Sequence, residues 1–375
     1  MNTHNNLSTH EAPDVLTEVR GQVGFITLNR PKALNALSLS MIRALTQCLL
    51  AWREDPTIQA VAIRGTNKAG PFGAFCAGGD IRFFHQAALE GNTELEDFFT
   101  EEYALNHLIH TYPKPYIAFM DGIVMGGGMG IAQGAKVRIV TESTKMAMPE
   151  TNIGLFPDVG GGYFLSRCPG RSGEWLALTG DMLGAGGALA LGLADACFDA
   201  AQLVKAWDAL VSLSVQEPDA VKKWVATYSI AATPYSTRAE GQIDQYFSLN
   251  SVSDIVQALE ASDDAWATHT AATLRQRSPL MLHVTLAQIR RARSMILADD
   301  LRMERDMVQH CFQPRHLERH SSQSETVEGI RALAVDKDHT PRWNPTRIED
   351  VTDAMVAPFF ISPWTPDTHP LRALS

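Results

Sequence analysis

The pattern of apolar and polar positions predicts alternating strands and helices over the first half of the chain. Two apolar runs on either side of a glycine turn indicate a β-hairpin over residues 15–28. An amphipathic helix is expected after Ser38 or Ser40, and another is expected to begin at Asp80. Further strands are predicted at residues 58–63, 116–120, 197–198 and, as a pair, 137–140 and 145–148; further helices are predicted at residues 94–111, 131–135, 160–165 and 174–178. This alternation is typical of an α/β fold.

The second half of the chain has a different pattern. From about residue 201 the strand signals nearly vanish, and helical spacing dominates at residues 255–260, 280–297 and 301–311. No linker rich in proline, glycine or serine separates the two halves. We therefore expect an α/β core over residues 14–200 and a helical C-terminal region over residues 201–375. That region should pack on the core and end in an extended tail rich in proline and tryptophan.

The stretch MPETNIGLFPDVGGG, residues 148–162, carries two carboxylates on a bent connection. Gly154 and Pro157 lie between Glu150 and Asp158 and exclude a continuous helix or central strand through the stretch. A bend can bring both carboxylates to one pocket. There, like charges and a low dielectric separate their pKa values, so that one serves as an acid and the other as a base. The alternative is a pair of solvated loop acids.

Two glycine turns upstream offer backbone donors. Gly78 and Gly79 precede the helix expected at Asp80, and residues 126–128 follow a predicted strand. Backbone N–H groups at helix starts, with no Cβ in the way, can point at one developing oxyanion and stabilise it. For each turn taken alone, the alternative is a tight turn or close helix packing.

Other motifs exclude several chemistries. The chain contains no complete G-x-G-x-x-G, no P-loop and no G-x-S-x-G, so dinucleotide, ATP and serine-hydrolase functions lack support. His107 and His110 have no evident third ligand, and the spacing HLERH near residue 318 does not match a zinc motif, so no metal site is expected. Cys76 lies beside the glycines, but no histidine partner is identifiable, and a small buried thiol is the preferred interpretation.

Charge and composition narrow the possible partners and the location. The formal net charge of −10 argues against nucleic acid and requires local cations for any anionic ligand. The longest uncharged apolar run, residues 182–194, is too short to span a bilayer and predicts a tightly packed helix. Five scattered cysteines fit a reducing compartment, and the first residues resemble neither a secretory signal nor a transit peptide. A cytoplasmic location is therefore predicted, and a homo-oligomer remains open.

Several of these motifs together resemble a known superfamily. The stretch AFCAGGDI, Gly127 at 48 residues after Gly79, and Glu150 at 23 residues after Gly127 closely resemble the crotonase (enoyl-CoA hydratase/isomerase) superfamily. Within this superfamily the sequence most closely resembles the branch of 3-hydroxyisobutyryl-CoA hydrolases. The stretches that carry this resemblance are NRPKALNAL, EEYALN, PKPYIA, FPDVGGGYF and VEGIRALAVDKDHTPRWNP. The similarity covers nearly the whole chain. It implies a spiral of β-β-α units with a helical C-terminal region.

The resemblance also implies roles for individual residues. By position, the amides of Gly79 and Gly127 correspond to the oxyanion hole for a thioester carbonyl, and Glu150 and Asp158 to the catalytic carboxylates. Glu102, in EEYALN, corresponds to a position that contacts substrate in the hydrolase branch. The substrate itself contains coenzyme A, so no separate cofactor is expected.

Three cations fall in regions that meet the adenine and phosphates of coenzyme A in relatives: Arg30, Lys32 and Arg82. A solvated surface position is the alternative for each of them. The chain also departs from hydratases, which carry a second glutamate where this sequence has Gly130 and a glycine where it has Asp158.

This departure favours attack on the thioester carbonyl over addition of water to a double bond. The function predicted is hydrolysis of 3-hydroxyisobutyryl-CoA to 3-hydroxyisobutyrate and coenzyme A, as in valine degradation. A hydratase or isomerase on the same fold, and a non-catalytic acyl-CoA-binding protein, remain alternatives. Whether Glu150 attacks the carbonyl or activates water stays open. The glycine-rich residues 181–191 leave the acyl specificity open too.

Overall fold

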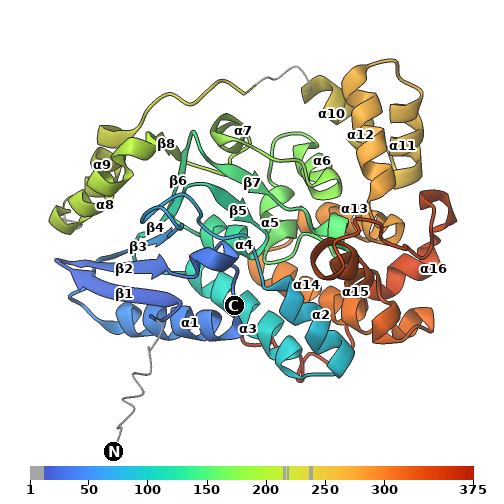
Figure 1. Cartoon of the computed structure of the whole chain (residues 1–375), viewed down its shortest axis with the longest axis horizontal. Helices are drawn as coiled ribbons and strands as arrows, with labels where there is room; N and C mark the ends of the chain where they lie inside the picture. Colours follow the sequence, from blue (N-terminus) through green and yellow to red (C-terminus); the bar gives the residue numbers. More distant parts are fainter. Residues whose placement is uncertain (1–11, 214–216, 218, 236–239) are drawn as a thin grey trace, which may run out of the picture.

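The computed structural model describes residues 12–213, 217, 219–235 and 240–375. In Figure 1 the strands, coloured blue to green, lie on one side of the molecule, and the helices after residue 240, yellow to red, lie on the other. Residues 1–13 are polar, and we expect them to be irregular; they fall outside this part of the chain except for the last two. An α/β class with a helical C-terminal region, as predicted, is confirmed.

The main sheet has six strands, all parallel to their neighbours except in the first hairpin. In spatial order they are β1 (Val15–Arg20), β2 (Val23–Leu28), β3 (Ala60–Gly65), β4 (Tyr116–Met120), β6 (Val137–Thr141) and β8 (Ala196–Phe198). Each was predicted to within a few residues. The inner strands β2, β3 and β4 read as mostly apolar runs because both faces of the sheet are buried there, whereas the edge strand β1 is largely exposed. On β3, for example, Val61 and Ile63 join one apolar cluster while Ala60 and Ala62 join the other.

The helices that cover the two faces come from different parts of the chain. One face packs against α1 (Leu39–Glu54), which is capped by Ser38 as expected, and α3 (Glu94–His110). The other face packs against α8 (Leu203–Ala209) and α9 (Ala220–Tyr228), and Trp207 fills its centre. Figure 1 shows α8 and α9 beside the sheet rather than among the other C-terminal helices. The domain boundary at residue 200 stays a prediction.

A second, small sheet corrects one prediction. It pairs β5 (Ile123–Met125) with β7 (Lys145–Ala147) in parallel, so residues 145–148 do not pair with residues 137–140. The turn between β6 and β7 directs the chain out of the main sheet. It is closed by a hydrogen bond of 3.0 Å from the amide of Thr144 to the carbonyl of Thr141. Both strands of the small sheet lead directly into the glycine and acid motifs.

Short helices follow these strands. Asp80 caps α2 (Ile81–Glu90), as predicted, and α4 (Gly127–Gln133) begins inside the glycine run, four residues before the predicted start. The remaining short helices are α5 (Gly161–Leu165), α6 (Ser172–Thr179) and α7 (Ala185–Ala190), the last shorter than its apolar run suggested. Glycine is required at Gly128, because a Cβ there would lie 2.3 Å from the carbonyl oxygen of Cys76.

After β8, the described residues form helices and connecting turns. The long helices are α10 (Glu240–Phe247), α11 (Val252–Glu260), α12 (Ala265–Gln276), α13 (Pro279–Ala292) and α14 (Leu297–Phe312). The single helix predicted over residues 280–297 is wrong: α13 ends at Ala292, and Ile296 is extended before α14 begins. Within the described ranges, none of the helices combines the length and the apolar character that a membrane span requires.

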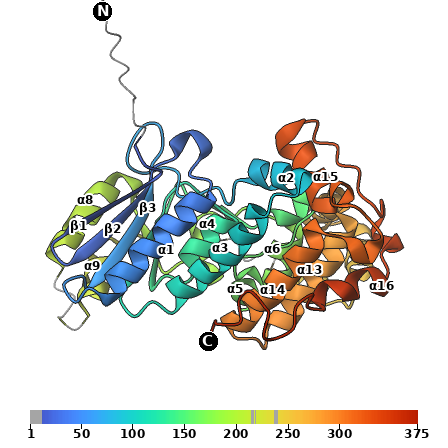
Figure 2. The ribbon, with the colours of Figure 1, turned by 90° about the horizontal axis from the view of Figure 1, so that it is seen from below.

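The tail is only partly extended, contrary to prediction. It contains three helical turns, η9 (Ile348–Asp350), α16 (Asp353–Val356) and η10 (Ala357–Phe360). Its end returns to α3 and α14, because the carbonyl oxygen of Ser375 lies 3.0 Å from Nε2 of His107 and Arg302 donates to the carbonyl of Leu371. In Figure 2 the chain terminus accordingly lies below α14.

Candidate active site

Two glycine turns place a pair of backbone amides side by side. Gly78 and Gly126 both have positive φ, +104° and +48°, which turns the chain sharply before Gly79 and Gly127. The turns are joined because the amide of Met125 donates to the carbonyl of Cys76 at 3.0 Å. A Cβ on Gly127 would lie 3.4 Å from the nitrogen of Gly79. In the described part of the chain neither the Gly79 nor the Gly127 amide donates a hydrogen bond, so both are available to one acceptor.

Two buried carboxyls lie beside this pair of amides, and the charge of a third acts on both of them. Glu150 opens a short helix, η2 (Glu150–Ile153), and its Oε1 lies 2.7 Å from the place that a Cβ on Gly126 would take. Glu102, on α3, has its Oε1 2.5 Å from the corresponding point on Gly127. Asp158 accepts a hydrogen bond from the hydroxyl of Tyr103 at 2.8 Å. Glu150 and Asp158 are 6% exposed and Glu102 is 2% exposed, which excludes solvated loop acids.

Burial separates the ionisation of these carboxyls. It raises the pKa of Glu150 well above its usual range, and the charge of Asp158 raises that pKa further. Burial also raises the pKa of Asp158, to about 6, against the lowering effect of the hydrogen bond from Tyr103. The pKa of Glu102 is raised by burial first, then by the charges of Asp158 and Glu150. Burial therefore favours the protonated form of all three carboxyls, and the charge of Asp158 adds to this effect at Glu150 and Glu102.

The loop that carries Asp158 is held from the C-terminal region. Glu304, on α14, accepts from the amide of Gly160 at 2.7 Å and from the amide of Gly162 at 3.0 Å. Gln288, on α13, donates to the carbonyl of Pro157 at 2.7 Å and to Glu304 at 3.1 Å. These bonds bracket Val159, a β-branched residue held at φ +57°, where it is strained. No local motif around Gln288 or Glu304 predicted these contacts.

A second support holds Glu150. The helix α15 (Glu325–Ile330) packs directly on η2: the hydroxyl of Thr326 donates to the carbonyl of Gly154 at 2.7 Å. A Cβ on Gly329 would lie 2.4 Å from the carbonyl oxygen of Ile153, so only glycine allows this approach. The VEGIRA segment, noted in the sequence for its resemblance, thus lies beneath Glu150.

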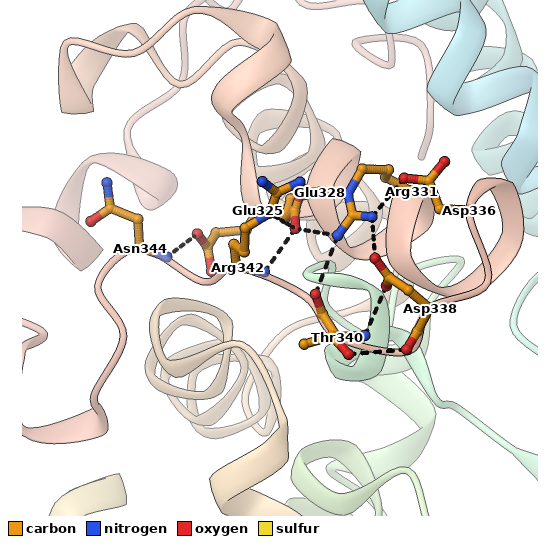
Figure 3. Close-up of polar contacts among 8 residues, drawn as sticks. All are labelled: Glu325, Glu328, Arg331, Asp336, Asp338, Thr340, Arg342 and Asn344. Carbon is orange, nitrogen blue, oxygen red and sulfur yellow. Dashed lines mark hydrogen bonds and ion pairs between the residues drawn. The ribbon is translucent and has the colours of Figure 1, made fainter.

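Arg331 ties the end of α15 to the chain that follows it (Figure 3). Its guanidinium donates to Glu328 at 2.8 and 2.9 Å, to Asp336 and Asp338 at 2.7 Å, and to the carbonyl of Thr340 at 3.2 Å. All of the guanidinium nitrogens are used, which is the fork geometry that arginine provides and lysine does not. This cluster fixes residues 336–340 against the helix that supports Glu150.

The predicted coenzyme A cations have distinct surroundings. Arg30 donates to Asp80 at 3.0 Å and to the carbonyl of Ala36 at 3.0 Å, so it braces the cap that follows Gly79. Arg82 is exposed on α2, two residues beyond that cap, and Lys32 lies in the turn after Arg30. Their contact with coenzyme A stays a prediction.

The other candidate chemistries have no geometric support. Cys76 is fully buried, burial raises the pKa of its thiol to about 12, and it donates to the carbonyl of Gly78, so the small buried thiol is confirmed. No group of three or more His, Cys, Asp or Glu side chains within the described ranges is arranged to hold a metal ion. The predictions of no metal and no separate cofactor stay predictions.

The fold and these amides define a crotonase-type α/β protein. The chain belongs to the enoyl-CoA hydratase/isomerase family, whose model matches residues 23–360. The predicted family membership is confirmed.

Relatives of known name extend over most of the chain. The mitochondrial 3-hydroxyisobutyryl-CoA hydrolase of Gallus gallus is 39% identical over 93% of this chain and 89% of its own. The 3-hydroxyisobutyryl-CoA hydrolase 1 of Arabidopsis thaliana is 39% identical over 92% of this chain and 91% of its own. A solved structure of a carnitinyl-CoA dehydratase from Mycobacterium thermoresistibile matches with a TM-score of 0.84 at 38% identity, covering 95% of this chain and 98% of that one. An enoyl-CoA hydratase from Rhodobacter sphaeroides 2.4.1 matches with a TM-score of 0.83 at 35% identity, covering 94% and 98%.

The predicted cytoplasmic location is contradicted by these relatives. The proteins from Gallus gallus, Xenopus tropicalis and Rattus norvegicus are all named mitochondrial. The prediction rested on the composition of the first residues. A mitochondrial targeting segment is separate from the folded domain and is removed after import, so the sequence of the domain itself does not indicate the compartment.

The hydrogen bond from Tyr103 to Asp158 leads to a prediction for how kcat/KM depends on pH. If Asp158 must be ionised, kcat/KM for thioester hydrolysis should fall about tenfold per pH unit below a pH of about 6. Tyr103→Phe removes the bond that lowers the pKa of Asp158, so this acidic limb should move to higher pH. Rate profiles from pH 5 to 8 measure the shift.

Tyr112→Phe is the matched control for this prediction. The hydroxyl of Tyr112 donates to the carbonyl of Leu49 at 2.8 Å, away from the acids, so its removal should leave the limb in place. An unshifted limb in Tyr103→Phe would show that Asp158 does not govern the rate at low pH.

Proposed function

We propose that the protein hydrolyses 3-hydroxyisobutyryl-CoA to 3-hydroxyisobutyrate and coenzyme A, a step of valine degradation. The relatives from Gallus gallus and Arabidopsis thaliana are named for this activity. The observation that carries the proposal is the buried pair Glu150 and Asp158 beside the two free glycine amides. This arrangement offers two donors for an oxyanion and two carboxyls for proton transfer.

The chemistry follows from the groups present. The thioester carbonyl oxygen would accept from the amides of Gly79 and Gly127 as it gains negative charge. In one route a carboxylate activates water, which attacks the carbonyl carbon. In the other, the carboxylate of Glu150 attacks the carbonyl carbon itself and forms an anhydride, which water then hydrolyses. In both routes the carbon–sulfur bond breaks, and the departing thiolate takes a proton from the pair. Two coupled carboxyls with raised pKa values can both accept a proton and supply one.

The hydratase alternative lacks a residue. The titles of the two similar solved structures name a dehydratase and a hydratase. A second glutamate at position 130 cannot fit here, because a Cβ on Gly130 would lie 2.6 Å from the Cβ of Val159. The non-catalytic alternative also has a cost: three buried acids oppose the anionic ligand that a binding protein would hold.

A panel of acyl-CoA esters distinguishes these functions. Free thiol release and the absorbance of the enoyl group are measured together for 3-hydroxyisobutyryl-CoA and for an enoyl-CoA. We expect thiol release from the first, with no gain or loss of enoyl absorbance in either. Enoyl chemistry without thiol release would favour a hydratase or isomerase, and binding without turnover would favour the non-catalytic alternative.

Coenzyme A binding predicts a salt-dependent effect at Arg82. Its phosphates require local cations because the chain as a whole is acidic. Arg82→Ala should raise KM for the acyl-CoA, more strongly at low ionic strength, and should leave kcat nearly unchanged, because a contact far from the carbonyl is made equally in the ground and transition states. Steady-state kinetics at two salt concentrations measure both constants.

Two further variants calibrate this result. Lys205→Ala removes an exposed charge on α8, at the other face of the sheet, and should change neither constant. Arg30→Ala should lower kcat as well, since Arg30 braces Asp80 directly after Gly79. If KM of Arg82→Ala equals that of the Lys205 control at low salt, Arg82 lies outside the substrate site.

A further inference from the structure

Asn106 is a buried amide without a partner. It lies on α3 one turn after Glu102 and is 3% exposed. Both its Nδ2 and its Oδ1 are buried, and neither has a hydrogen-bond partner among the described residues. Buried polar groups are almost always paired, so an amide with both ends unpaired calls for a partner that binds there.

The position of Asn106 points to the acyl group. Its Nδ2 lies 2.9 Å from the place that a Cβ on Gly130 would take. On α3, Glu102 contacts Gly127 of α4. One turn later on α3, Asn106 contacts Gly130, which lies nearly one turn after Gly127 on α4. The two helices thus carry matching positions: the first level holds the oxyanion amide, and the second level, about 5 Å further, holds Asn106.

A cavity continues from the second level. Asn106 lines it together with Gly130, Val159 and Gly160, and its volume is about 180 Å³. Val159 directly follows Asp158, so the inner wall of the cavity adjoins the acids. A small branched acyl group bound by its carbonyl at Gly127 can extend in this direction, because no side chain of residue 130 stands in the way.

We propose that the Asn106 amide hydrogen-bonds the 3-hydroxyl of the acyl group and thereby selects 3-hydroxyacyl thioesters. This inference rests on the proposed hydrolase function. A hydroxyl donates one hydrogen bond and accepts others, and the amide of Asn106 offers an acceptor and donors to match. The hydroxyl oxygen is three bonds from the carbonyl carbon, and a hydrogen bond of about 2.9 Å extends beyond it, so together they can span one helical turn of about 5.4 Å. A site built to bind a hydroxyl discriminates strongly against the analogue that lacks it.

The test compares two esters that differ only in the hydroxyl. We would measure kcat/KM for 3-hydroxyisobutyryl-CoA and for isobutyryl-CoA with the wild type and with Asn106→Leu, which has a similar size and no polar atoms. The wild type should prefer the hydroxy ester. In Asn106→Leu, kcat/KM for the hydroxy ester should fall about tenfold to a hundredfold, while that for isobutyryl-CoA should hold or rise. If Asn106→Leu does not fold, Asn106→Ala is measured in the same way.

Gln133→Leu is the matched control. Gln133 is a second amide that lines the cavity, but it already donates to the carbonyl of Leu193 at 3.0 Å, so its loss should leave the ratio of the two esters unchanged. If Asn106→Leu leaves the ratio of kcat/KM for the two esters unchanged, the assignment is overturned. Asn106 would then bind a water molecule or serve only in packing. A wild type that releases no thiol from either ester would instead refute the proposed function and this assignment with it.

Discussion

Glu150→Gln, Asp158→Asn and the double variant are expected to share a similarly low kcat, each about a hundredfold to ten-thousandfold below the wild type. The two carboxyls are coupled, because burial raises both pKa values, that of Asp158 to about 6, and the charge of Asp158 raises that of Glu150 as well. In the proposed reaction they pass the proton of the attacking water or leaving thiol between them. Neither half of such a pair can accept and return the proton alone. The losses are therefore not additive, and removing one acid costs about as much as removing both.

The stability of these variants separates lost catalysis from lost folding. Burial raises the pKa of both acids, so their contribution to the free energy of unfolding is full at low pH and is lost as the pH rises through the folded-state values. Above a pH of about 6 the neutral amides should thus melt at or above the wild-type temperature. Thermal melting and calorimetric binding of the intact thioester should both show a folded, binding-competent protein.

Glu101→Gln supplies the control for the acids. Glu101 precedes Glu102 on α3, but it lies outside the pocket and pairs with Arg43 at 2.6 Å, so its replacement should leave kcat unchanged. The result that would contradict the assignment is an Asp158→Asn enzyme that still releases coenzyme A at nearly the wild-type rate. Position 158 would then be structural, and the hydratase or isomerase alternative would regain the lead.

Local sequence patterns predicted most of the helices and strands, because these elements are determined by residues that are close together in the sequence. The strands of the main sheet show as apolar runs, and Ser38 and Asp80 cap helices where short polar side chains precede apolar spacing. The errors have non-local causes. Residues 145–148 pair with β5 rather than with the preceding strand, and the break between Ala292 and Leu297 contains no proline or glycine to mark it.

The site was predictable only in part, for the same reason. Glu150, Asp158 and the glycines lie in short motifs, whereas the C-terminal side chains that hold the two acid loops come from more than a hundred residues away. Asp300 and Glu304 are four residues apart on α14 and look like the polar face of an amphipathic helix, yet both are fully buried. A usable signal was that Leu301 and Met303, beside them, are apolar too, which argues against a solvated face.

The C-terminal region therefore belongs to the site and is more than a cover for the core. Glu304 and Gln288 hold the backbone on both sides of Asp158, and α15 supports the turn of Glu150. Positioning by side chains that are themselves packed keeps catalytic groups in a productive geometry. The acids on the α/β half are thus positioned by helices that lie on the other side of the molecule in Figure 1.

The proposed oxyanion hole leads to the second large prediction. Gly127→Pro and Gly127→Ala both add a Cβ, which would meet Oε1 of Glu102 at 2.5 Å, but only proline removes the N–H donor. Gly127 is the first residue of α4, where the fixed φ of proline is tolerated, so the two variants differ chiefly in the donor.

We expect Gly127→Pro to have a kcat about a hundredfold to a thousandfold below that of Gly127→Ala, the usual effect of losing one oxyanion donor. Steady-state hydrolysis of 3-hydroxyisobutyryl-CoA by both variants measures this ratio, and their melting temperatures check that both are folded. The comparison cancels the steric effect at Glu102 because both variants share it. Equal kcat values for the two folded variants would make Gly127 a packing glycine and would leave the thioester carbonyl without its second donor.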